Sequence, residues 1–184
     1  MSWLVTGMIL LIGIHLVPSF PALRRRLVNL QGINAYQAGF GLIALLGLVL
    51  IAMGFSDSQF TLLWQPPAWG RLVNLVLMVP ALILLVAAYL PSNIKRYTRH
   101  PMLWGVVIWS IGHLLSNGDT ASLILFGGLG LFALFDMLSA NLRGARKQQQ
   151  AVSAGHETLV ISGGIIVYLA LLYLHPLLFG VSAI

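Results

Sequence analysis

The chain has 184 residues, of which 59% are hydrophobic and only 8% are charged. A soluble domain carries roughly 25% charged residues, so the polar side chains here are too few to cover a soluble globule. The formal net charge is +6, and cysteine is absent. The absence of cysteine excludes disulfides, iron–sulfur clusters and thiolate ligands to a metal.

Apolar windows of roughly 20 residues predict membrane-spanning helices. We expect about six of them, separated by joints that contain proline or glycine, at residues 2–20, 38–55, 71–90, 101–117, 121–142 and 158–180. The first window lacks the basic start and the cleavage site of a signal peptide, so we expect it to be retained. The expected fold class is all-α, a polytopic membrane helix bundle, with residues 1–184 forming a single transmembrane domain.

The basic residues predict the orientation of the bundle. Nine of the ten lie in the joints after the first, third and fifth predicted helices, and only Arg71 lies on the other side. Because basic loops stay on the cytoplasmic side, both termini are expected on the non-cytoplasmic side. The sequence pI of about 10.3 comes from these loop residues. Because they report membrane topology, the high pI does not indicate a nucleic-acid partner.

Two histidines, His15 and His113, fall inside predicted membrane helices. At 1.5 Å per residue they lie roughly 9 Å and roughly 18 Å from the cytoplasmic ends of their helices. An unpaired imidazole in hydrocarbon is costly, so each ring either donates to a carbonyl or serine of a neighbouring helix or holds a ligand. With only four acidic residues in the chain, the pair favours axial ligation of haem b, whose porphyrin supplies the other four nitrogens.

The predicted helix around His113 carries a face of residues suited to a flat ligand. Gly105, Trp109, Gly112 and Ser116 share that face with the histidine. We expect the two glycines and the serine to leave room near the backbone, and Trp109 to form a wall of the space.

Further candidates lie near the ends of the predicted helices. Arg99 and His100 offer charge-assisted donors to haem propionates, a substrate phosphate or lipid headgroups, or else form a basic anchor at the start of a helix. Arg25 either sets topology or pairs with a propionate. Asp136 either forms a salt bridge with a loop arginine or relays protons, and His175 either caps or anchors the outer end.

Three blocks of the sequence carry a family resemblance. They are "IHLVPSFPALRRRLVNLQGINAYQAGFGLIAL", "TRHPMLWGVVIWSIGHLLSNGD" and "YLHPLLFGVS", and in this order they resemble the NnrU family of bacterial integral membrane proteins. That family is associated with denitrification and nitric oxide metabolism. It is related to plant zeta-carotene isomerase, a membrane haem b enzyme that isomerises a cis double bond of a carotene.

The resemblance implies a multi-pass protein of the bacterial inner membrane. His15 and His113 match the axial iron ligands of the plant isomerase, whereas Ser110 stands where that enzyme has a cysteine linked to redox switching, so a thiol switch is ruled out here. The block "RHPMLWG" also resembles a cofactor-holding signature of membrane isoprenylcysteine methyltransferases and sterol reductases.

These patterns favour a membrane haem b protein whose iron acts on an apolar small-molecule substrate, as a cis–trans isomerase-like enzyme, or senses nitric oxide. The alternatives are a non-catalytic assembly or haem-handling factor and a methyltransferase-like enzyme that uses "RHPMLWG". Whether the protein is an enzyme, and whether it forms an oligomer, stays open at this point. Membrane lipid is a further expected partner.

Overall fold

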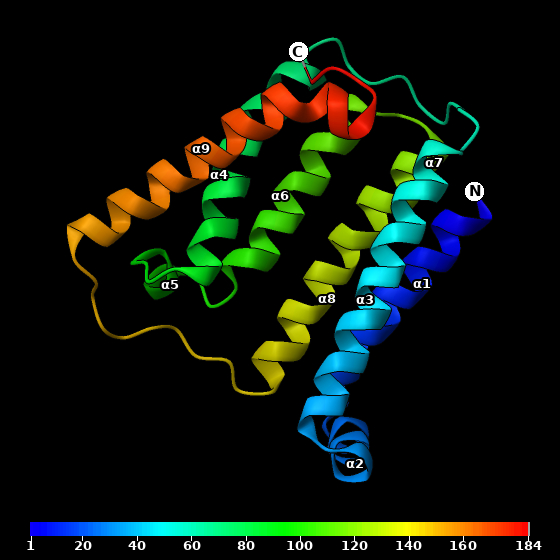
Figure 1. The fold of residues 1–184 in the computed structure, drawn as a ribbon. Helices are drawn as coiled ribbons and strands as arrows, with labels where there is room; N and C mark the ends of the chain where they lie inside the picture. Colours follow the sequence, from blue (N-terminus) through cyan, green and yellow to red (C-terminus); the bar gives the residue numbers. More distant parts are fainter. Residues whose placement is uncertain (184) are drawn as a thin grey trace.

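The computed structural model describes residues 1–183, which are helical apart from the connecting segments (Figure 1). The six main helices are α1 Ser2–Leu16, α3 Ile33–Ser56, α4 Gly70–Tyr89, α6 Pro101–Ser116, α8 Gly128–Leu142 and α9 Ala154–Phe179. The short elements are η1 Val17–Ser19, α2 Pro21–Gln31, α5 Ile94–Tyr97, α7 Thr120–Ser122 and η2 Leu123–Gly127. Extended pairing within residues 1–183 is confined to an isolated bridge between Leu62 and Asp119. The all-α prediction is confirmed.

Five segments within the described residues are long and apolar enough to cross a membrane. They are Ser2–Ser19, Ile33–Ser56, Gly70–Tyr89, Thr120–Leu142 and Ala154–Phe179. The remaining expected span, the fourth in chain order, forms α6, an apolar helix of 16 residues. At 1.5 Å per residue α6 is about 24 Å long, which is shorter than the hydrocarbon core of about 30 Å. The protein is therefore a multi-pass membrane protein with five full-length candidate spans and one shorter apolar helix.

The main helices run alternately between the two ends of the molecule. Both termini lie at one end, and α2, α5 and the connection between α8 and α9 lie at the other (Figure 1). The second end carries nine of the ten basic residues, from the arginine run in α2 to Lys147. We call it the basic end.

Helix α2 is an element that the sequence analysis treated as part of a joint. Pro21 begins it at the position where a missing N–H has no cost, and Gly32, with φ +84°, ends it. The three arginines of α2 are exposed, and the helix lies across the direction of α1 and α3 (Figure 1). This placement is typical of an amphipathic helix at a membrane interface. Because Gly32 ends α2 at once, α3 begins five residues earlier than expected.

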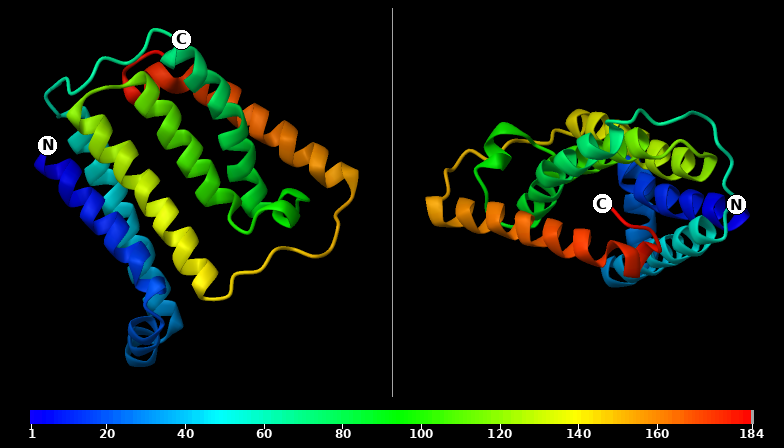
Figure 2. Two further views of the ribbon diagram at one scale, coloured as in Figure 1. Left: turned by 180° about the vertical axis from the view of Figure 1, so that it is seen from behind. Right: turned by 90° about the horizontal axis from the view of Figure 1, so that it is seen from above.

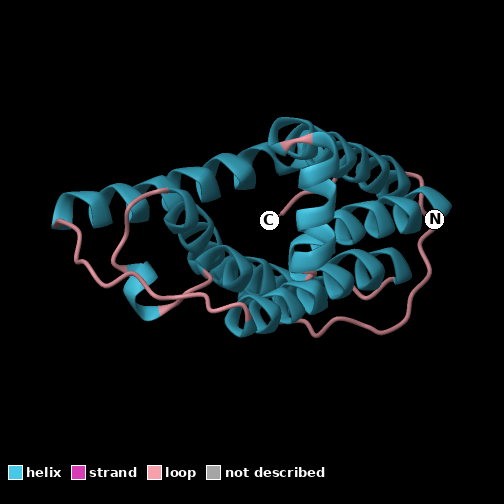
Figure 3. Ribbon diagram, turned by 90° about the horizontal axis from the view of Figure 1, so that it is seen from below, coloured by secondary structure: helices cyan, strands magenta, loops and turns pink. Residues whose placement is uncertain are grey.

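Helix α8 occupies the middle of the bundle. On one side α8 contacts α1, which packs on α3; on the other side it contacts α6, which is followed by α4 and α9 (Figure 2). Seen along the helices from below, the bundle forms an arc with the C-terminal segment on its inner side (Figure 3).

The helical segment before α8 contains an irregular turn. The expected single helix over 121–142 is interrupted by η2, a π-helical turn over Leu123–Gly127. Asp119 caps its start by accepting hydrogen bonds from the Ser122 amide at 3.0 Å and the Ser122 hydroxyl at 2.6 Å. Such π turns are frequent at functional sites, and this one carries Phe126, which contacts one of the two candidate histidines.

Glycines set the closest helix contacts. A Cβ atom added at Gly7 of α1 would lie 2.7 Å from both the Gly47 carbonyl oxygen and the Ile51 nitrogen of α3. A Cβ atom at Gly164 of α9 would lie 2.6 Å from the Ile83 Cα of α4. Small residues at these positions let the backbones approach, as is common between membrane helices.

Candidate functional site

His15 lies in the last turn of α1 and is held by its own helix. Its Nδ1 atom is 2.8 Å from the Leu11 carbonyl oxygen. A carbonyl oxygen only accepts, so Nδ1–H is the donor, and in the neutral ring the Nε2 atom keeps its lone pair. The ring packs 4.9 Å from the Phe40 ring of α3 and 6.1 Å from the Phe132 ring of α8, both edge to face.

His113 of α6 has the same local arrangement. Its Nδ1 atom donates to the Trp109 carbonyl oxygen at 2.9 Å, which again leaves Nε2 with a lone pair in the neutral ring. The imidazole stacks on Phe126 of η2, with ring centroids 4.5 Å apart and an interplanar angle of 23°. The Trp109 ring lies 5.0 Å away.

The two imidazoles contact the same helical segment at different heights. Phe132 and Phe126 are six residues apart, which corresponds to about 9 Å along a helix and to faces about 120° apart around it. The axial offset agrees with the difference in depth that the sequence predicts. Helices α1 and α6 thus flank neighbouring faces of the same helix, and within residues 1–183 their histidines have different aromatic partners.

The glycine face near His113 is filled by a neighbouring helix, which corrects one expectation. A Cβ atom at Gly105 would lie 2.8 Å from the Ala81 carbonyl oxygen, and one at Gly112 would lie 2.8 Å from Met78 Cε. Both neighbours belong to α4. The glycines therefore serve the close approach of α4 and α6 and leave no room for a flat ligand there. Trp109 and His113 point instead towards η2.

Buried polar atoms without a partner mark two places near the histidines. Among the described residues, the Tyr36 hydroxyl and the Asn74 Oδ1 atom are buried without a hydrogen bond. Tyr36 lies 6.3 Å from Phe40, which contacts His15, and Asn74 lies against Gly112, next to His113. Sequence reasoning missed both, although a lone asparagine in the apolar run "LVNLVLMVP" is the kind of intramembrane polar residue that merits attention. The Ser110 hydroxyl, against Gly130, is a third such atom.

Arg99 and His100 lie at the opposite end of α6 from His113. Arg99 Nη1 and His100 Nε2 each lie 3.0 Å from Asn141 Oδ1, at the end of α8. His100 precedes His113 by 13 residues, or roughly 20 Å along a helix. These two side chains therefore belong to a separate site at the basic end.

The remaining candidates are Asp136, Arg25 and His175, of which His175 interacts electrostatically with His113. Asp136 forms an ion pair with Arg143 at 3.4 Å and accepts from the Ser19 hydroxyl at 3.5 Å, which confirms the salt-bridge alternative. Arg25 is exposed on α2. His175 donates from Nδ1 to the Val181 carbonyl oxygen at 2.7 Å, at the end of the molecule that holds the termini.

The donor inventory limits the kind of metal centre that side chains alone could form. No group of three His, Asp or Glu side chains that could hold a metal ion occurs within residues 1–183. A structural zinc site would need four such ligands. A macrocycle that brings four nitrogens of its own needs only one or two.

The fold and the paired imidazoles define a polytopic α-helical membrane protein with two intramembrane histidines on either side of a central helix. The family model described as NnrU protein matches residues 3–183. The chain therefore belongs to the NnrU family. Comparison with curated proteins and with solved structures gave no match.

Proposed function

We propose that the protein is a membrane haem b protein in which the imidazoles of His15 and His113 would hold the iron. The observation that carries the proposal is the matched hydrogen bond of each ring. Both Nδ1 atoms donate to the carbonyl oxygen four residues earlier, at 2.8 Å and 2.9 Å. In haem and zinc proteins the second ring nitrogen of a ligating histidine is commonly held in this way, which fixes the tautomer and the ring orientation.

The surroundings of the imidazoles also suit an apolar macrocycle. Each ring lies among aromatic side chains, and the buried Tyr36 hydroxyl, on the His15 side, lacks a partner within the described chain. A bound group that offered an acceptor would satisfy the Tyr36 hydroxyl. The donor set thus fits the group.

Haem would supply an iron centre able to take nitric oxide or to coordinate a polyene. The chain itself would hold the haem through the imidazoles of α1 and α6, orient both rings and keep water away through the surrounding aromatic side chains. Family membership supports a role in nitric oxide and denitrification metabolism, and the relationship to the plant isomerase supports cis–trans isomerisation of an apolar substrate as the reaction.

The orientation follows from the charges. The basic end would face the cytoplasm of a bacterial inner membrane, and both termini would face the other side, because lysine and arginine residues accumulate on the cytoplasmic side. The chain has no cysteine of its own, so a single cysteine can be introduced at exposed Ser153 of the basic end or at partly exposed Ser58 of the opposite end. Labelling of each variant with a membrane-impermeant maleimide in intact cells tests the orientation. Labelling of Ser153→Cys without Ser58→Cys would contradict the orientation.

The absorbance spectrum of the purified protein tests the haem proposal. We expect a Soret band that survives extensive detergent washing and shifts on reduction and on addition of nitric oxide. His15→Ala and His113→Ala should each reduce or shift the band, and added imidazole should restore part of it. His156→Ala is the control, since His156 is exposed at the basic end, where its Nδ1 atom lies 2.8 Å from the Ser153 hydroxyl, and should leave the band unchanged.

Three results would contradict the proposal. A protein that stays colourless with added haemin would exclude haem binding. A band that neither His15→Ala nor His113→Ala alters, in variants that keep the helical circular dichroism of the parent, would exclude these ligands. Haem that washes away with detergent would favour the alternative of a haem-handling factor over a resident cofactor.

A further inference from the structure

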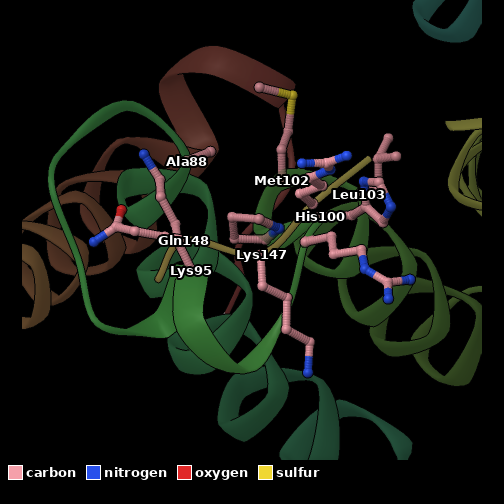
Figure 4. Close-up of a pocket in the computed structure, with 10 residues that line it drawn as sticks. Ala88, Lys95, His100, Met102, Leu103, Lys147 and Gln148 are labelled. Atoms are coloured by element: carbon pink, nitrogen blue, oxygen red, sulfur yellow. The ribbon is translucent and has the colours of Figure 1, made fainter. Parts of the chain in front are cut away.

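A pocket at the basic end is lined mainly by cationic side chains. It has a volume of about 460 Å³ and lies where α5, the start of α6 and the connection after α8 meet (Figure 4). Its basic members are Lys95, Arg99, His100, Arg146 and Lys147. Because the site lies about 20 Å along α6 from His113, its function is independent of the haem proposal.

Hydrogen bonds of the backbone and of the Asn93 and Glu157 side chains hold the pocket together across two distant segments. The Gln148 amide donates to the Lys95 carbonyl oxygen at 3.1 Å. Asn93 and Val152 exchange two hydrogen bonds, of 3.0 Å and 3.1 Å. The Glu157 carboxylate accepts from the Asn93 amide at 2.7 Å. These contacts place Arg146 and Lys147 beside Lys95, although about 50 residues separate them in the sequence.

Within residues 1–183 the charge in this pocket has no counterion. No acidic residue lines it. Asp136 pairs with Arg143, and Glu157 accepts from Ser92 and Asn93. The side chains of Lys95, Arg146 and Lys147 form no hydrogen bond or ion pair with any other part of residues 1–183. Like charges gathered in this way repel one another unless an anion lies among them.

The start of α6 adds to the attraction for an anion. Met102 and Leu103 line the pocket and occupy the first turn of a 16-residue helix. The N–H groups of that turn have no partner within the helix and carry its partial positive charge. Backbone donors and basic side chains around one cavity are the usual features of a phosphate site.

Apolar and interfacial side chains around the cavity indicate where the anion comes from. The side chains of Met102, Leu103 and Ala88 form part of its lining. Three large aromatic residues near it in the sequence are exposed, Tyr89 at 74%, Tyr97 at 78% and Trp104 at 43%. Exposed tyrosine and tryptophan side chains are typical of the headgroup level of a bilayer. The pocket therefore suits a ligand with an anionic head and an apolar tail.

We propose that this pocket binds a phosphate monoester group, carried by an anionic membrane lipid. A monoester has a charge of about −1.5 to −2 near neutral pH, which balances several cationic groups better than the single charge of a phosphodiester. The monoester oxygens accept hydrogen bonds from Lys95, Arg146, Lys147 and the first turn of α6.

Binding to the full-length protein in neutral detergent tests the proposal. The probes are dioctanoyl phosphatidic acid, dioctanoyl phosphatidylglycerol, glycerol 3-phosphate and inorganic phosphate, each followed by thermophoresis at fixed ionic strength. We expect phosphatidic acid to bind at least about tenfold more tightly than phosphatidylglycerol, as one extra charge-assisted hydrogen bond implies. Equally tight binding of glycerol 3-phosphate or inorganic phosphate would support the monoester site and overturn the lipid as its source.

Matched variants distinguish binding in the pocket from attraction to the general positive charge of the basic end. Arg146→Gln removes a pocket arginine, and Arg26→Gln removes an exposed arginine of α2 at the same end. We expect Arg146→Gln to weaken phosphatidic acid binding roughly tenfold and Arg26→Gln to have little effect. Equal binding of the two lipids, or equal loss in both variants, would show that only net charge acts and would overturn the proposal.

Discussion

Replacing Gly7 by alanine should separate α1 from α3, the contact that fixes the helix carrying His15. The new Cβ atom would lie 2.7 Å from two backbone atoms of α3 and 2.9 Å from Ile51 Cγ1. Ordinary van der Waals contact begins near 3.4 Å, so the helices must part locally by about 0.7 Å. Backbone atoms cannot move aside as a flexible side chain can.

The expected loss of stability follows from comparison with Gly13, a second glycine of the same helix. Gly13 has nothing within 4 Å of an added Cβ, so Gly13→Ala shares the gain in helix propensity, about 1 kcal/mol at most, without the overlap. Overpacking of a well-packed contact costs about 1–3 kcal/mol. We expect Gly7→Ala to be less stable than Gly13→Ala by that amount.

Reversible unfolding in mixed micelles of neutral detergent and dodecyl sulfate, followed by far-UV circular dichroism, measures the difference. The haem spectrum gives a second readout, because displacement of α1 should disturb the His15 ligand in Gly7→Ala and leave it intact in Gly13→Ala. Stabilities that agree to within about 0.5 kcal/mol, the usual range of neutral surface changes, would refute the close packing of α1 on α3.

Two further variants test contacts that hold the connecting segments. Glu157→Gln should weaken the 2.7 Å hydrogen bond from the Asn93 backbone amide by roughly 1 kcal/mol. Limited proteolysis should then cut the connection between α8 and α9 faster in the variant than in the parent. An unchanged rate of cleavage would contradict this role of Glu157. Asp119→Ala should lose the cap on Ser122, of 3.0 Å, and about 1 kcal/mol of stability in the unfolding assay. Asp57→Ala is its control, since no side-chain hydrogen bond of Asp57 occurs within the described residues, and equal losses in the two variants would argue against the cap.

Hydrophobic windows and charge placement were sufficient to predict an all-α membrane bundle from the sequence. They located each main helix, because a long apolar run has few alternatives to a helix in a bilayer. They missed α2, since its arginines suggest a joint and its amphipathic pattern is short. They also counted the fourth predicted helix as a full-length span, although α6 ends at Ser116 and has only 16 residues.

The candidate site was less predictable. Helical spacing placed Gly105 and Gly112 on a face near His113, but it could not show that α4 packs against that face. The basic pocket depends on hydrogen bonds between residues 92–95 and 148–157, and no local pattern reveals contacts of that separation. The Nδ1 bonds of His15 and His113 are local, four residues apart, and could have been expected from helix geometry alone.

The short α6 has a consequence for the bilayer around the protein. Trp104 and Ile111 of this helix are 43% and 50% exposed, so part of α6 meets lipid although it lies between α4 and α8. Its length falls about 6 Å short of a typical hydrocarbon core, and each ångström of such mismatch costs a fraction of a kcal/mol. Lipids with shorter acyl chains relieve this cost, so the thickness of the host membrane becomes a determinant of how stable this bundle is.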